Sequence, residues 1–422
     1  MKNSGIEWIG EIPDSWKLER LQWHMFEIKE QNTPVKTMQV LSLTNKLGVV
    51  PYEQKGEQGN KSKENYEEYK IAYPQTIVAN SMNILIGSVG ICNYLGCVSP
   101  VYYVFKPLEN ENIEYLNYVF QLTEFQKELR KYASGILEIR LRLAASDILK
   151  QEVAFPSKAE QKKIVEYLHQ KLSNVDKLIE VQQAQIDKLK EYKQSVITEA
   201  VTKGLDPTVP MKDVSNWMRR IPCNWFEPKI KYFCSIESGG TPERTHPEYW
   251  NGDINWFKTG ELHNDEIFDS EEKITVKAIE ETAAKIFPKN TILVAMYGQG
   301  KTRGMTALLK KESATNQACA AIQLKTKTYE VNYLWWVLKG AYNSLRERAN
   351  GSGQPNLSVS LISEFEISLP LLLEQQKIIC YLDDKCAKID KLIAIKQAKI
   401  DKLQEYKKSL IYEYVTGKKE VM

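Results

Sequence analysis

The sequence has few histidines and no paired cysteines. Its 422 residues include four histidines and seven cysteines, and no two cysteines have CxxC spacing. An odd number of cysteines without such spacing predicts reduced thiols, and the scattered histidines predict no zinc site. We therefore expect neither a structural disulfide nor a bound metal.

Long apolar runs are missing as well. No stretch of about 18 apolar residues occurs, and the opening Met-Lys-Asn-Ser-Gly lacks the apolar core of a signal peptide. We expect a cytoplasmic protein with no membrane partner. Neither sign of charge dominates, because 57 Lys and Arg against 54 Asp and Glu leave a net charge of +3. Any contact with DNA would therefore need a local basic patch.

Motifs for catalysis are absent too. The sequence contains no Pro-Pro pair, and so no Asn-Pro-Pro-aromatic motif of an adenine methyltransferase. It has no glycine-rich cofactor loop at the start of a doubly wound sheet and no set of helicase motifs. The spacing of its Asp and Glu residues singles out no acid–base pair. We expect a chain without enzymatic activity, catalytic residues or a cofactor of its own.

What the sequence does contain is a long helical segment that occurs twice. Residues 160–202 align without a gap on residues 374–416, and 25 of the 43 aligned pairs are identical. Apolar residues recur at alternating steps of four and three, which is the pattern of a coiled-coil seam. Polar residues interrupt both seams at the same two steps: Gln182 and Lys193, then Lys396 and Lys407. They either align the two helices or are long side chains that reach solvent.

Each copy predicts a helix about 65 Å long, at roughly 1.5 Å per residue. We expect the two helices to pair antiparallel within the chain, and pairing with another chain is the alternative. Identities away from the seam indicate a surface that binds the same kind of partner twice; a recent duplication and a solvated face are the competing explanations. The predicted partner-binding residues are Asp176, Lys177, Asp187, Lys188, Glu191, Tyr192, Asp390, Lys391, Asp401, Lys402, Glu405 and Tyr406.

A second motif recurs ahead of each globular part. Trp8-Ile9-Gly10-Glu11-Ile12-Pro13-Asp14-Ser15-Trp16 and Trp217-Met218-Arg219-Arg220-Ile221-Pro222-Cys223-Asn224-Trp225 both place Ile-Pro midway between two tryptophans. Each globular part then ends in a strand-like segment and a proline, four residues before the Glu-Gln that starts the helix. Both halves therefore follow the same order of motifs.

The globular parts have the pattern of small mixed α/β domains. In the second, residues 291–296 predict a strand and residues 331–345 a helix; in the first, residues 76–79 and 101–105 predict strands, residues 87–90 a turn and residues 113–129 a helix. Two diverged copies of one domain fit this pattern better than two unrelated domains. Gly204, Pro207 and Pro210 end the first long helix. The expected division is residues 1–156 and 205–370 for the domains, and residues 157–204 and 371–422 for the helices.

This arrangement resembles the specificity subunit of type I restriction-modification systems. The resemblance rests on Trp8-Ile9-Gly10-Glu11-Ile12-Pro13, on the helix start Glu160-Gln161-Lys162-Lys163-Ile164-Val165 and on their second copies, and it covers nearly the whole chain. It implies an α+β fold, in which two mixed α/β target recognition domains are joined by two long helices. These helices would form an antiparallel coiled coil with a pseudo-twofold internal repeat.

The resemblance also implies a function. Each domain would read one half of a bipartite target in double-stranded DNA, while the helices set the spacing and hold two methyltransferase subunits. S-adenosylmethionine would belong to those subunits. Translocating endonuclease subunits, which use ATP and Mg, would be further partners.

One segment matches a relaxed phosphate-binding loop. Residues 295–302 read Ala-Met-Tyr-Gly-Gln-Gly-Lys-Thr, but the following Arg303-Gly304-Met305-Thr306 favours a hairpin over the helix that such a loop needs. Two alternatives to DNA recognition therefore stay open: nucleotide binding at this segment, and a coiled-coil adaptor that binds only proteins.

The same segment fits better as a turn that contacts DNA, because its glycines let the backbone approach phosphates and its polar side chains reach base edges. Its expected counterpart, residues 87–93, is uncharged, as in a domain that reads a different half-site. The predicted DNA-binding residues of the second domain are Thr241, Arg244, Thr245, Tyr297, Gln299, Lys301, Thr302, Arg303, Gln354 and Asn356. Those of the first are Asn60, Lys61, Lys63, Asn80, Ser88, Asn93, Arg140 and Arg142.

Overall fold

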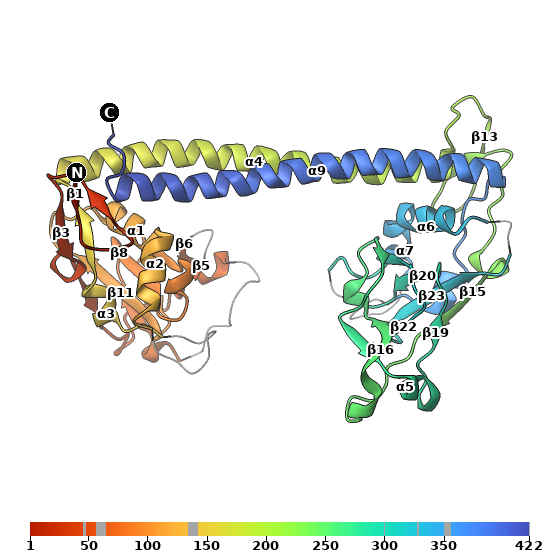
Figure 1. Ribbon diagram of the computed structural model, residues 1–422, viewed down its shortest axis with the longest axis horizontal. Helices are drawn as coiled ribbons and strands as arrows, with labels where there is room; N and C mark the ends of the chain where they lie inside the picture. The colour runs from red at the N-terminus through yellow and green to blue at the C-terminus, as the bar shows by residue number, and fades with distance from the viewer. Residues whose placement is uncertain are drawn as a thin grey trace. The chain divides into compact units, whose positions relative to one another are not determined.

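The structure, a computed structural model, describes residues 1–44, 48–55, 65–133, 142–298, 300–326, 329–349 and 356–421. It divides into two compact units: unit 1 comprises Met1–Gln183 and Ala398–Met422, and unit 2 comprises Ala184–Gln397. Each unit holds one globular domain together with a stretch of each long helix, α4 (Lys158–Lys203) and α9 (Leu372–Val415) (Figure 1).

The two long helices pack antiparallel along the predicted seam. In unit 1, Lys407 of α9 forms an ion pair with Asp176 of α4. In unit 2, Lys193 of α4 forms the equivalent ion pair with Asp390 of α9 at 2.6 Å. The predicted antiparallel coiled coil is therefore confirmed. Because Lys193 and Lys407 bind acids on the facing helix, and Lys396 donates to Gln185 of α4 at 2.5 Å, the role of the seam lysines in alignment is favoured over simple exposure to solvent.

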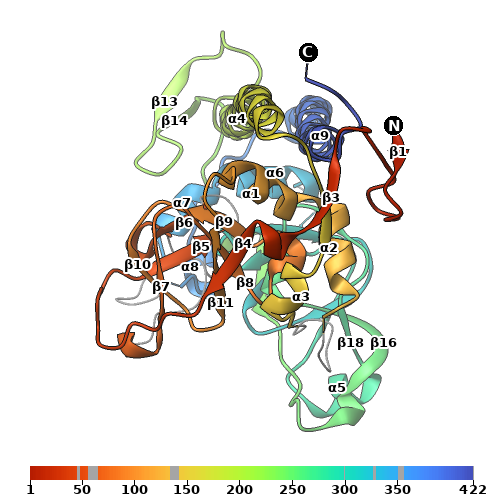
Figure 2. The same cartoon turned by 90° about the vertical axis from the view of Figure 1, so that its left-hand side faces the viewer.

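A four-stranded antiparallel sheet forms the centre of unit 1. Its strand order is β4 (Met25–Ile28), β11 (Tyr102–Pro107), β8 (Thr76–Asn80) and β9 (Val89–Cys92). Shorter antiparallel pairs are β1 (Lys2–Asn3) with β2 (Glu11–Ile12), β3 (Lys17–Arg20) with β12 (Glu152–Phe155), β5 (Leu41–Thr44) with β6 (Gly48–Pro51), and β7 (Lys70–Ala72) with β10 (Gly96–Val98). Helix α1 (Ile113–Gln121) lies between the sheet and the long helices (Figures 1 and 2). Helices α2 (Thr123–Arg130) and α3 (Ala145–Leu149) complete the domain.

Unit 2 repeats this plan and adds to it. Its main sheet has the order β15 (Cys234–Ser238), β23 (Cys319–Leu324), β20 (Ile292–Ala295), β21 (Thr306–Leu309) and β17 (Glu266–Ile267). The first four strands follow the order of β4, β11, β8 and β9 in unit 1. A second sheet orders β18 (Glu272–Ile274), β16 (Trp250–Phe257), β22 (Ser313–Thr315) and β19 (Ile286–Phe287). Its antiparallel pair β22–β19 corresponds to the pair β10–β7 of unit 1, because each joins the strand before the central hairpin to the strand after it. β16 pairs parallel with β22, as Val40 does with Cys97 of β10. The remaining elements are the pair β13 (Met211–Asp213) and β14 (Arg220–Pro222), α5 (Val276–Glu281), α6 (Val331–Gly340), α7 (Tyr342–Glu347) and α8 (Val359–Ser363).

The expectation of two diverged copies of one mixed α/β domain is thus confirmed, with one correction in each copy. Residues 113–129 and 331–345 do not each form a single helix. The first breaks at Leu122, whose extended backbone (ψ 121°) ends α1, and the second breaks at Ala341 between α6 and α7. The break lets the second helix of each pair turn toward the end of the central hairpin, where α2 packs against the turn after β8.

The recurring tryptophan and Glu-Gln motifs meet in space. The Nε1 of Trp16 donates to Oε1 of Glu160 at 2.9 Å, and the Nε1 of Trp225 donates to Oε2 of Glu374 at 3.0 Å. Each following glutamine donates to the carbonyl of the proline before the helix: Gln161 to Pro156 at 3.2 Å, Gln375 to Pro370 at 3.0 Å. The two motifs therefore recur together because they form one joint between the domain and its long helix.

The end of α9 completes unit 1. Tyr412 donates to the carbonyl of Trp8 at 3.0 Å, and Lys418 donates to the carbonyl of Glu11 at 2.5 Å. The buried Tyr115 donates to the carbonyl of Val415 at 3.1 Å. Both chain ends consequently lie in the same unit, where the last turns of α9 cover the first tryptophan motif (Figure 1).

Candidate DNA-reading edge and partner face

In each unit, the loops that connect the strands of the main sheet lie together at one edge of that sheet. In unit 2, β15 and β20 end at this edge while β21 and β23 begin there, since neighbouring strands are antiparallel. The N–H of Met296 donates to the carbonyl of Ala318 at 2.9 Å, and the hydroxyl of Thr241 donates to the neighbouring Gln317. We call this the loop edge; in unit 2 it comprises residues 239–245, 296–298, 300–305, 316–318 and 356–357. Predicted DNA-binding residues from three separate segments thus lie along one edge.

The segment that resembles a phosphate-binding loop is a hairpin. β20 pairs antiparallel with β21, and no helix follows the loop. Arg346 of α7 fixes the backbone of this loop. Its Nη1 donates to the carbonyl of Arg303 at 2.8 Å, and its Nη2 donates to the carbonyl of Gly300 at 2.8 Å. Tyr342 donates to the carbonyl of Lys301 at 2.6 Å. These bonds leave the side chains of Tyr297 and Lys301 exposed, so the loop presents an aromatic ring and an ammonium on a fixed backbone.

Residues far along the chain complete the loop edge in the same way in both units. The N–H of Leu357 donates to the carbonyl of Met296 at 3.0 Å, and the N–H of Leu143 donates to the carbonyl of Ser81 at 3.4 Å. Asn356 and the exposed Arg142 directly precede these leucines and occupy equivalent positions. The two units therefore present a different polar side chain at the same place beside the central hairpin.

The structure corrects which loop of unit 1 corresponds to this hairpin. Gly87 and Gly304 both adopt positive φ (83° and 84°) two residues before β9 and β21, a conformation that glycine adopts without strain. The counterpart of residues 296–304 is therefore residues 81–87, which form a loop two residues shorter. The predicted counterpart, residues 87–93, is wrong because most of it is strand β9.

Three predicted residues of unit 1 are poorly placed for DNA contact. Asn80 and Ser88 are buried, at 8% and 5% exposure, and Oδ1 of Asn80 accepts from the N–H of Met82 at 3.0 Å. The side chain of Asn80 therefore holds the loop, and neither side chain faces outward. Asn93 is exposed, but it follows β9 at the opposite end of the sheet.

Near Thr241, the loop edge of unit 2 borders a cavity of about 550 Å³. Arg244 donates to Glu272 at 2.8 Å and lies 4.4 Å from the ring centroid of Trp250, while the hydroxyl of Thr245 is turned to Glu243 at 2.9 Å. The polar residues that line this cavity include Lys258 and Asn316, which the sequence analysis did not predict. Their positions could have identified them, because each residue directly follows a strand of the second sheet.

Carboxylates surround the lysine of this cavity. Lys258 contacts Glu271 at 3.1 Å and Glu272 at 3.2 Å, and these hydrogen bonds raise the pKa of the ammonium. Since its charge is largely balanced, the cavity suits hydrogen bonding to a base edge more than neutralisation of a phosphate.

Some predicted positions lie outside the described residues, namely Asn60, Lys61, Lys63, Arg140, Gln299 and Gln354. The side chains of Thr302 and Arg303 are described and half-buried. Within the described ranges there is no group of three or more His, Cys, Asp or Glu side chains that could hold a metal, and no helix suited to cross a membrane. The seven cysteines are free thiols.

All twelve predicted partner-binding residues of the long helices are exposed. Among them, Asp176 and Asp390 have a role inside the chain, since they pair with seam lysines. These ion pairs explain why the two aspartates recur, so their recurrence is weaker evidence for a partner-binding surface than the sequence alone indicated. Tyr192 and Tyr406 are each 49% exposed at equivalent positions and retain their value as candidates.

The structure adds apolar residues to these faces. Leu178 and Leu392 are each 48% exposed, and Val181 and Ile395, again equivalent, are 50% and 56% exposed. Exposed apolar side chains on a helix indicate a contact surface when they gather at repeated positions. Pattern reasoning missed them because it selected only charged residues and tyrosine among the identical positions, although Leu178 and Leu392 are identical and lie off the seam. In unit 1 this partner face contains Leu178, Val181 and Tyr406; in unit 2 it contains Leu392, Ile395 and Tyr192.

At the joint between α6 and the long helices, unit 2 has a half-buried lysine, Lys339. The amine of Lys339 lies 3.2 Å from the ring centroid of Trp335 and 4.3 Å from that of Trp336. Burial, with a smaller contribution from Lys193, lowers the pKa of Lys339 to about 7. Trp336 in turn donates to Asp383 of α9 at 3.0 Å.

Comparison with known proteins agrees with this architecture. Residues 13–191 and 222–405 match the family described as "Type I restriction modification DNA specificity domain". The chain is 36% identical over 173 residues to the MjaIX specificity subunit of Methanocaldococcus jannaschii, a match covering 39% of each chain. It is 23% identical over 315 residues to the MjaVIII specificity subunit of the same organism, covering 72% of this chain and 69% of the relative.

A third relative, the EcoR124I/EcoR124II specificity subunit of Escherichia coli, is 26% identical over 149 residues, or 34% of this chain and 37% of the relative. The chain thus spans less than two-fifths of the first two curated relatives. A solved chain from a type I R-M system superimposes with a TM-score of 0.69 at 12% identity, covering 96% of this chain and 98% of that one, which shows a shared fold. With the family matched over most of both halves, this chain belongs to the type I restriction-modification specificity family and carries its DNA specificity domain twice.

Proposed function

We propose that this chain reads a bipartite sequence in double-stranded DNA, with one domain for each half-site. The observation that carries the proposal is the loop edge: two copies of one sheet hold it in the same way but present different side chains. Arg142 beside residues 81–87 and Asn356 beside residues 296–304 occupy equivalent positions and offer different hydrogen-bonding groups. Sequence is read by such groups at base edges, whereas phosphate contacts set orientation.

Unit 2 offers the better-defined surface for this purpose. Tyr297 and Lys301 are exposed on a loop that Arg346 braces, and Thr241 lies on the same edge. A braced loop loses little conformational entropy on binding, which favours discrimination between bases. Since the chain has a net charge of only +3, we expect much of the phosphate neutralisation to come from partner subunits.

The long helices have the second part of the proposed role. We propose that α4 and α9, which each run through both units, set the separation of the two half-sites, and that the partner faces each bind one methyltransferase subunit. S-adenosylmethionine would be bound by those subunits. Translocating endonuclease subunits with ATP and Mg would complete a restriction complex. The proposed division of the chain keeps residues 1–156 and 205–370 as recognition domains and residues 157–204 and 371–422 as spacer helices.

Methylation mapping tests this proposal. The chain is expressed with its methyltransferase in cells that lack other adenine methylation, and modified adenines are located by sequencing. We expect a split motif, of which only the first half changes when residues 17–155 are exchanged for another family member's domain. A pattern without a split motif, or one unaffected by the exchange, would contradict DNA reading and favour an adaptor that binds only proteins.

Nucleotide binding at residues 295–302 is not favoured, because a hairpin follows β20 where a phosphate loop needs the N-terminus of a helix.

A further inference from the structure

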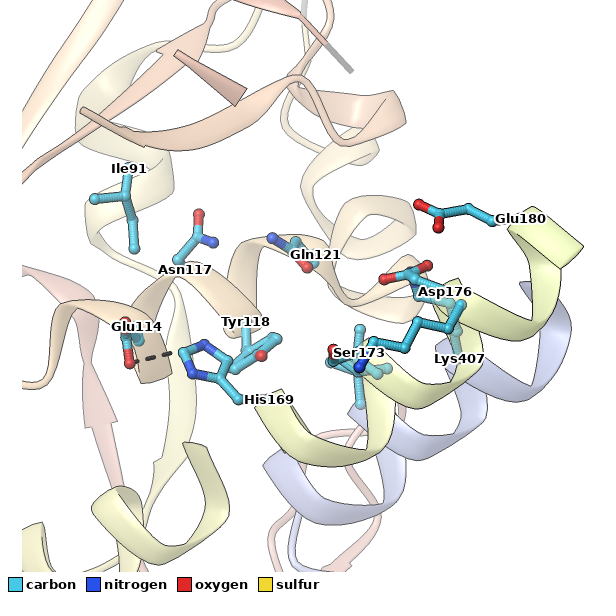
Figure 3. A pocket seen from close by; sticks show the side chains of 13 residues that line it. Ile91, Glu114, Asn117, Tyr118, Gln121, His169, Ser173, Asp176, Glu180 and Lys407 are labelled. Atoms are coloured by element: carbon cyan, nitrogen blue, oxygen red, sulfur yellow. Dashed lines mark hydrogen bonds and ion pairs between the residues drawn. The ribbon is translucent and has the colours of Figure 1, made fainter. Parts of the chain in front are cut away.

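Two cavities of similar size occur in the described parts of the chain, and they lie in different surroundings. The cavity of unit 1, of about 580 Å³, lies between α1 and the long helices. Figure 3 shows Glu114, Asn117 and Gln121 of α1 on one side of it, and Asp176 and Glu180 of α4 on the other. Its lining residues do not include any of residues 81–87 or 142–143, so this cavity belongs to the joint and not to the loop edge.

In unit 2 the domain itself fills the equivalent space at the joint. Tyr115 of α1 and Tyr333 of α6 are equivalent, because both are buried and donate to the last strand-like segment of their domain. Counting along the two helices from these tyrosines aligns Asn117 with Trp335, and Gln121 with Lys339. The amine of Lys339 lies against the ring of Trp335, so these larger side chains occupy the space that shorter ones leave open in unit 1.

The cavity of unit 2, of about 550 Å³, lies instead at the loop edge, where strands of both sheets end. Its lining includes Thr241 and Arg244 after β15, residues 258–261 after β16, and Asn316 after β22. β16 and β22 are parallel, and the N–H of Asn316 donates to the carbonyl of Phe257 at 3.0 Å. The cavity therefore opens among the residues that we propose for DNA reading.

Two glycines fix the backbone just before it reaches this cavity. A Cβ atom at Gly239 would lie 2.0 Å from the carbonyl oxygen of Thr315. A Cβ atom at Gly240 would lie 2.3 Å from the carbonyl oxygen of Ala283, so larger residues do not fit at either position. The Nε1 of Trp256 also donates to the carbonyl of Gly240 at 2.9 Å. The segment that carries the cavity arginine thus starts from a fixed point between the two sheets.

The side chain of Arg244 is held on two sides but remains open to a ligand. Its Nη2 donates to Oε2 of Glu272 at 2.8 Å, and its guanidinium lies 4.4 Å from the ring centroid of Trp250. The Nε1 of Trp250 donates to the carbonyl of Glu243 at 3.2 Å, which fixes the ring beside the arginine. The side chain of Arg244 is still 60% exposed, and Glu272 is its one hydrogen-bond partner among the described residues. A guanidinium held in this way loses less entropy for each further hydrogen bond.

Another arginine of unit 2 provides an internal reference. The Nη2 of Arg348 donates to Glu366 at 2.8 Å, and its guanidinium lies 4.7 Å from the ring centroid of Phe365. This side chain is only 35% exposed, and it belongs neither to the loop edge nor to the lining of the cavity. A carboxylate and a ring around an arginine can therefore serve the fold alone. What distinguishes Arg244 is its exposure at the cavity.

The charges around the cavity favour a base over a phosphate. Glu261 and Glu271 line it together with Arg244 and Lys258, and Glu272 contacts both of these cations. The carboxylates thus outnumber the cations, and a phosphate group would meet net repulsion. A base edge has no net charge, so hydrogen-bond donors and acceptors decide which base fits.

We propose that Arg244 reads a guanine in the half-site of unit 2, where the free N–H groups of its guanidinium donate to O6 and N7 in the major groove. Guanine presents two acceptors at these positions, whereas adenine presents an amino donor beside its N7. Trp250 and Glu272 are positioning residues, because they act by setting the plane of the guanidinium. This inference rests on the proposed function, which assigns one half-site to each unit.

The test compares two lysine substitutions in the full chain, assembled with its methyltransferase. Arg244→Lys keeps the positive charge but removes the planar fork, and Arg348→Lys makes the same change away from the loop edge. The motif of methylated adenines is mapped in cells. Binding of the assembled complex is then measured by competition with duplexes that vary one base pair at a time, and thermal unfolding verifies that the variants are folded.

We expect Arg244→Lys to reduce the preference for guanine at one position of the second half-site at least about tenfold, and Arg348→Lys to leave every position unchanged. The first half-site should not respond to either variant. Trp250→Leu should relax the same position as Arg244→Lys, and Trp250→Phe, which retains a ring, should relax it less. With 7-deazaguanine, which lacks the N7 acceptor, at that position, the wild-type complex should lose more affinity than the Arg244→Lys complex.

The outcomes separate this inference from the proposed function. A second half-site without a G·C pair, or a guanine preference that Arg244→Lys leaves intact, would overturn the inference while bipartite reading stands. A loss of affinity that is uniform over all sequences, with a shallower dependence on salt, would assign Arg244 to a phosphate and overturn the inference as well. If the wild-type complex methylates no split motif, the proposed function fails, and this inference fails with it.

Discussion

The joint between the first tryptophan motif and α4 allows a quantitative prediction. Glu160 accepts a hydrogen bond from Nε1 of Trp16 at 2.9 Å and lies in the first turn of α4. Its carboxylate therefore has two effects: it pairs a buried indole N–H, since Trp16 is only 1% exposed, and it places a negative charge at the positive end of a helix. Two substitutions separate these effects.

Glu160→Gln keeps a side-chain oxygen that can accept from the indole but removes the charge, which should cost about 0.3–1 kcal/mol of unfolding free energy. Glu160→Met removes the acceptor as well. The indole N–H is then buried and unpaired, which adds about 1–3 kcal/mol. We therefore expect Met to be the more destabilising substitution by at least about 1 kcal/mol.

Urea unfolding followed by tryptophan fluorescence measures the free energies, and hydrogen exchange over the first turns of α4 localises the effect. Glu374→Gln and Glu374→Met form a matched series, because Glu374 accepts from Trp225 at 3.0 Å in unit 2. If the Gln and Met variants at residue 160 unfold with the same free energy, the hydrogen bond contributes nothing beyond the helix-terminal charge and the reasoning is refuted.

Two further predictions concern unit 2. Arg346→Met removes both bonds to the carbonyls of the hairpin loop, so DNA affinity of the assembled complex should fall about tenfold at fixed salt and base preference should relax at the second half-site only. Gln126→Met, at the equivalent place beside Gly87, is the control and should leave the second half-site unchanged; equal effects would refute the bracing role. Because burial lowers the pKa of Lys339 to about 7, the folded state binds fewer protons than the unfolded state between that pH and about 10.5. The unfolding free energy should accordingly rise with pH from about 7 to 10 by at most about 1.4 kcal/mol per unit, and in Lys339→Met this rise should be absent from denaturant titrations at each pH.

Much of the fold could be predicted from the sequence because the signals were local. The long helices follow from steps of four and three along a continuous segment, and the hairpin after β20 follows from Gly304 within the segment itself. The break at Leu122 had no such signal. It results from tertiary packing, since α1 lies against the long helices whereas α2 packs at the hairpin end.

Individual site residues were harder to predict, because a residue's type does not reveal which way its side chain points. Asn80 and Ser88 had the composition of a DNA-contacting turn, yet the strand pairing turns both inward. Arg346 had no reason to be singled out, because the carbonyls that it holds are more than 40 residues away in the sequence.

The sequence by itself determined that this protein is two versions of one design, since a coiled-coil period and repeated motifs are properties of the chain alone. Only the tertiary structure decided how the versions differ at their joints. Trp335 and Lys339 fill in unit 2 a space that Asn117 and Gln121 leave open in unit 1. That difference depends on how these side chains of α1 and α6 pack against the long helices. Such contacts join segments that are distant in the sequence, so they exist only in the folded chain.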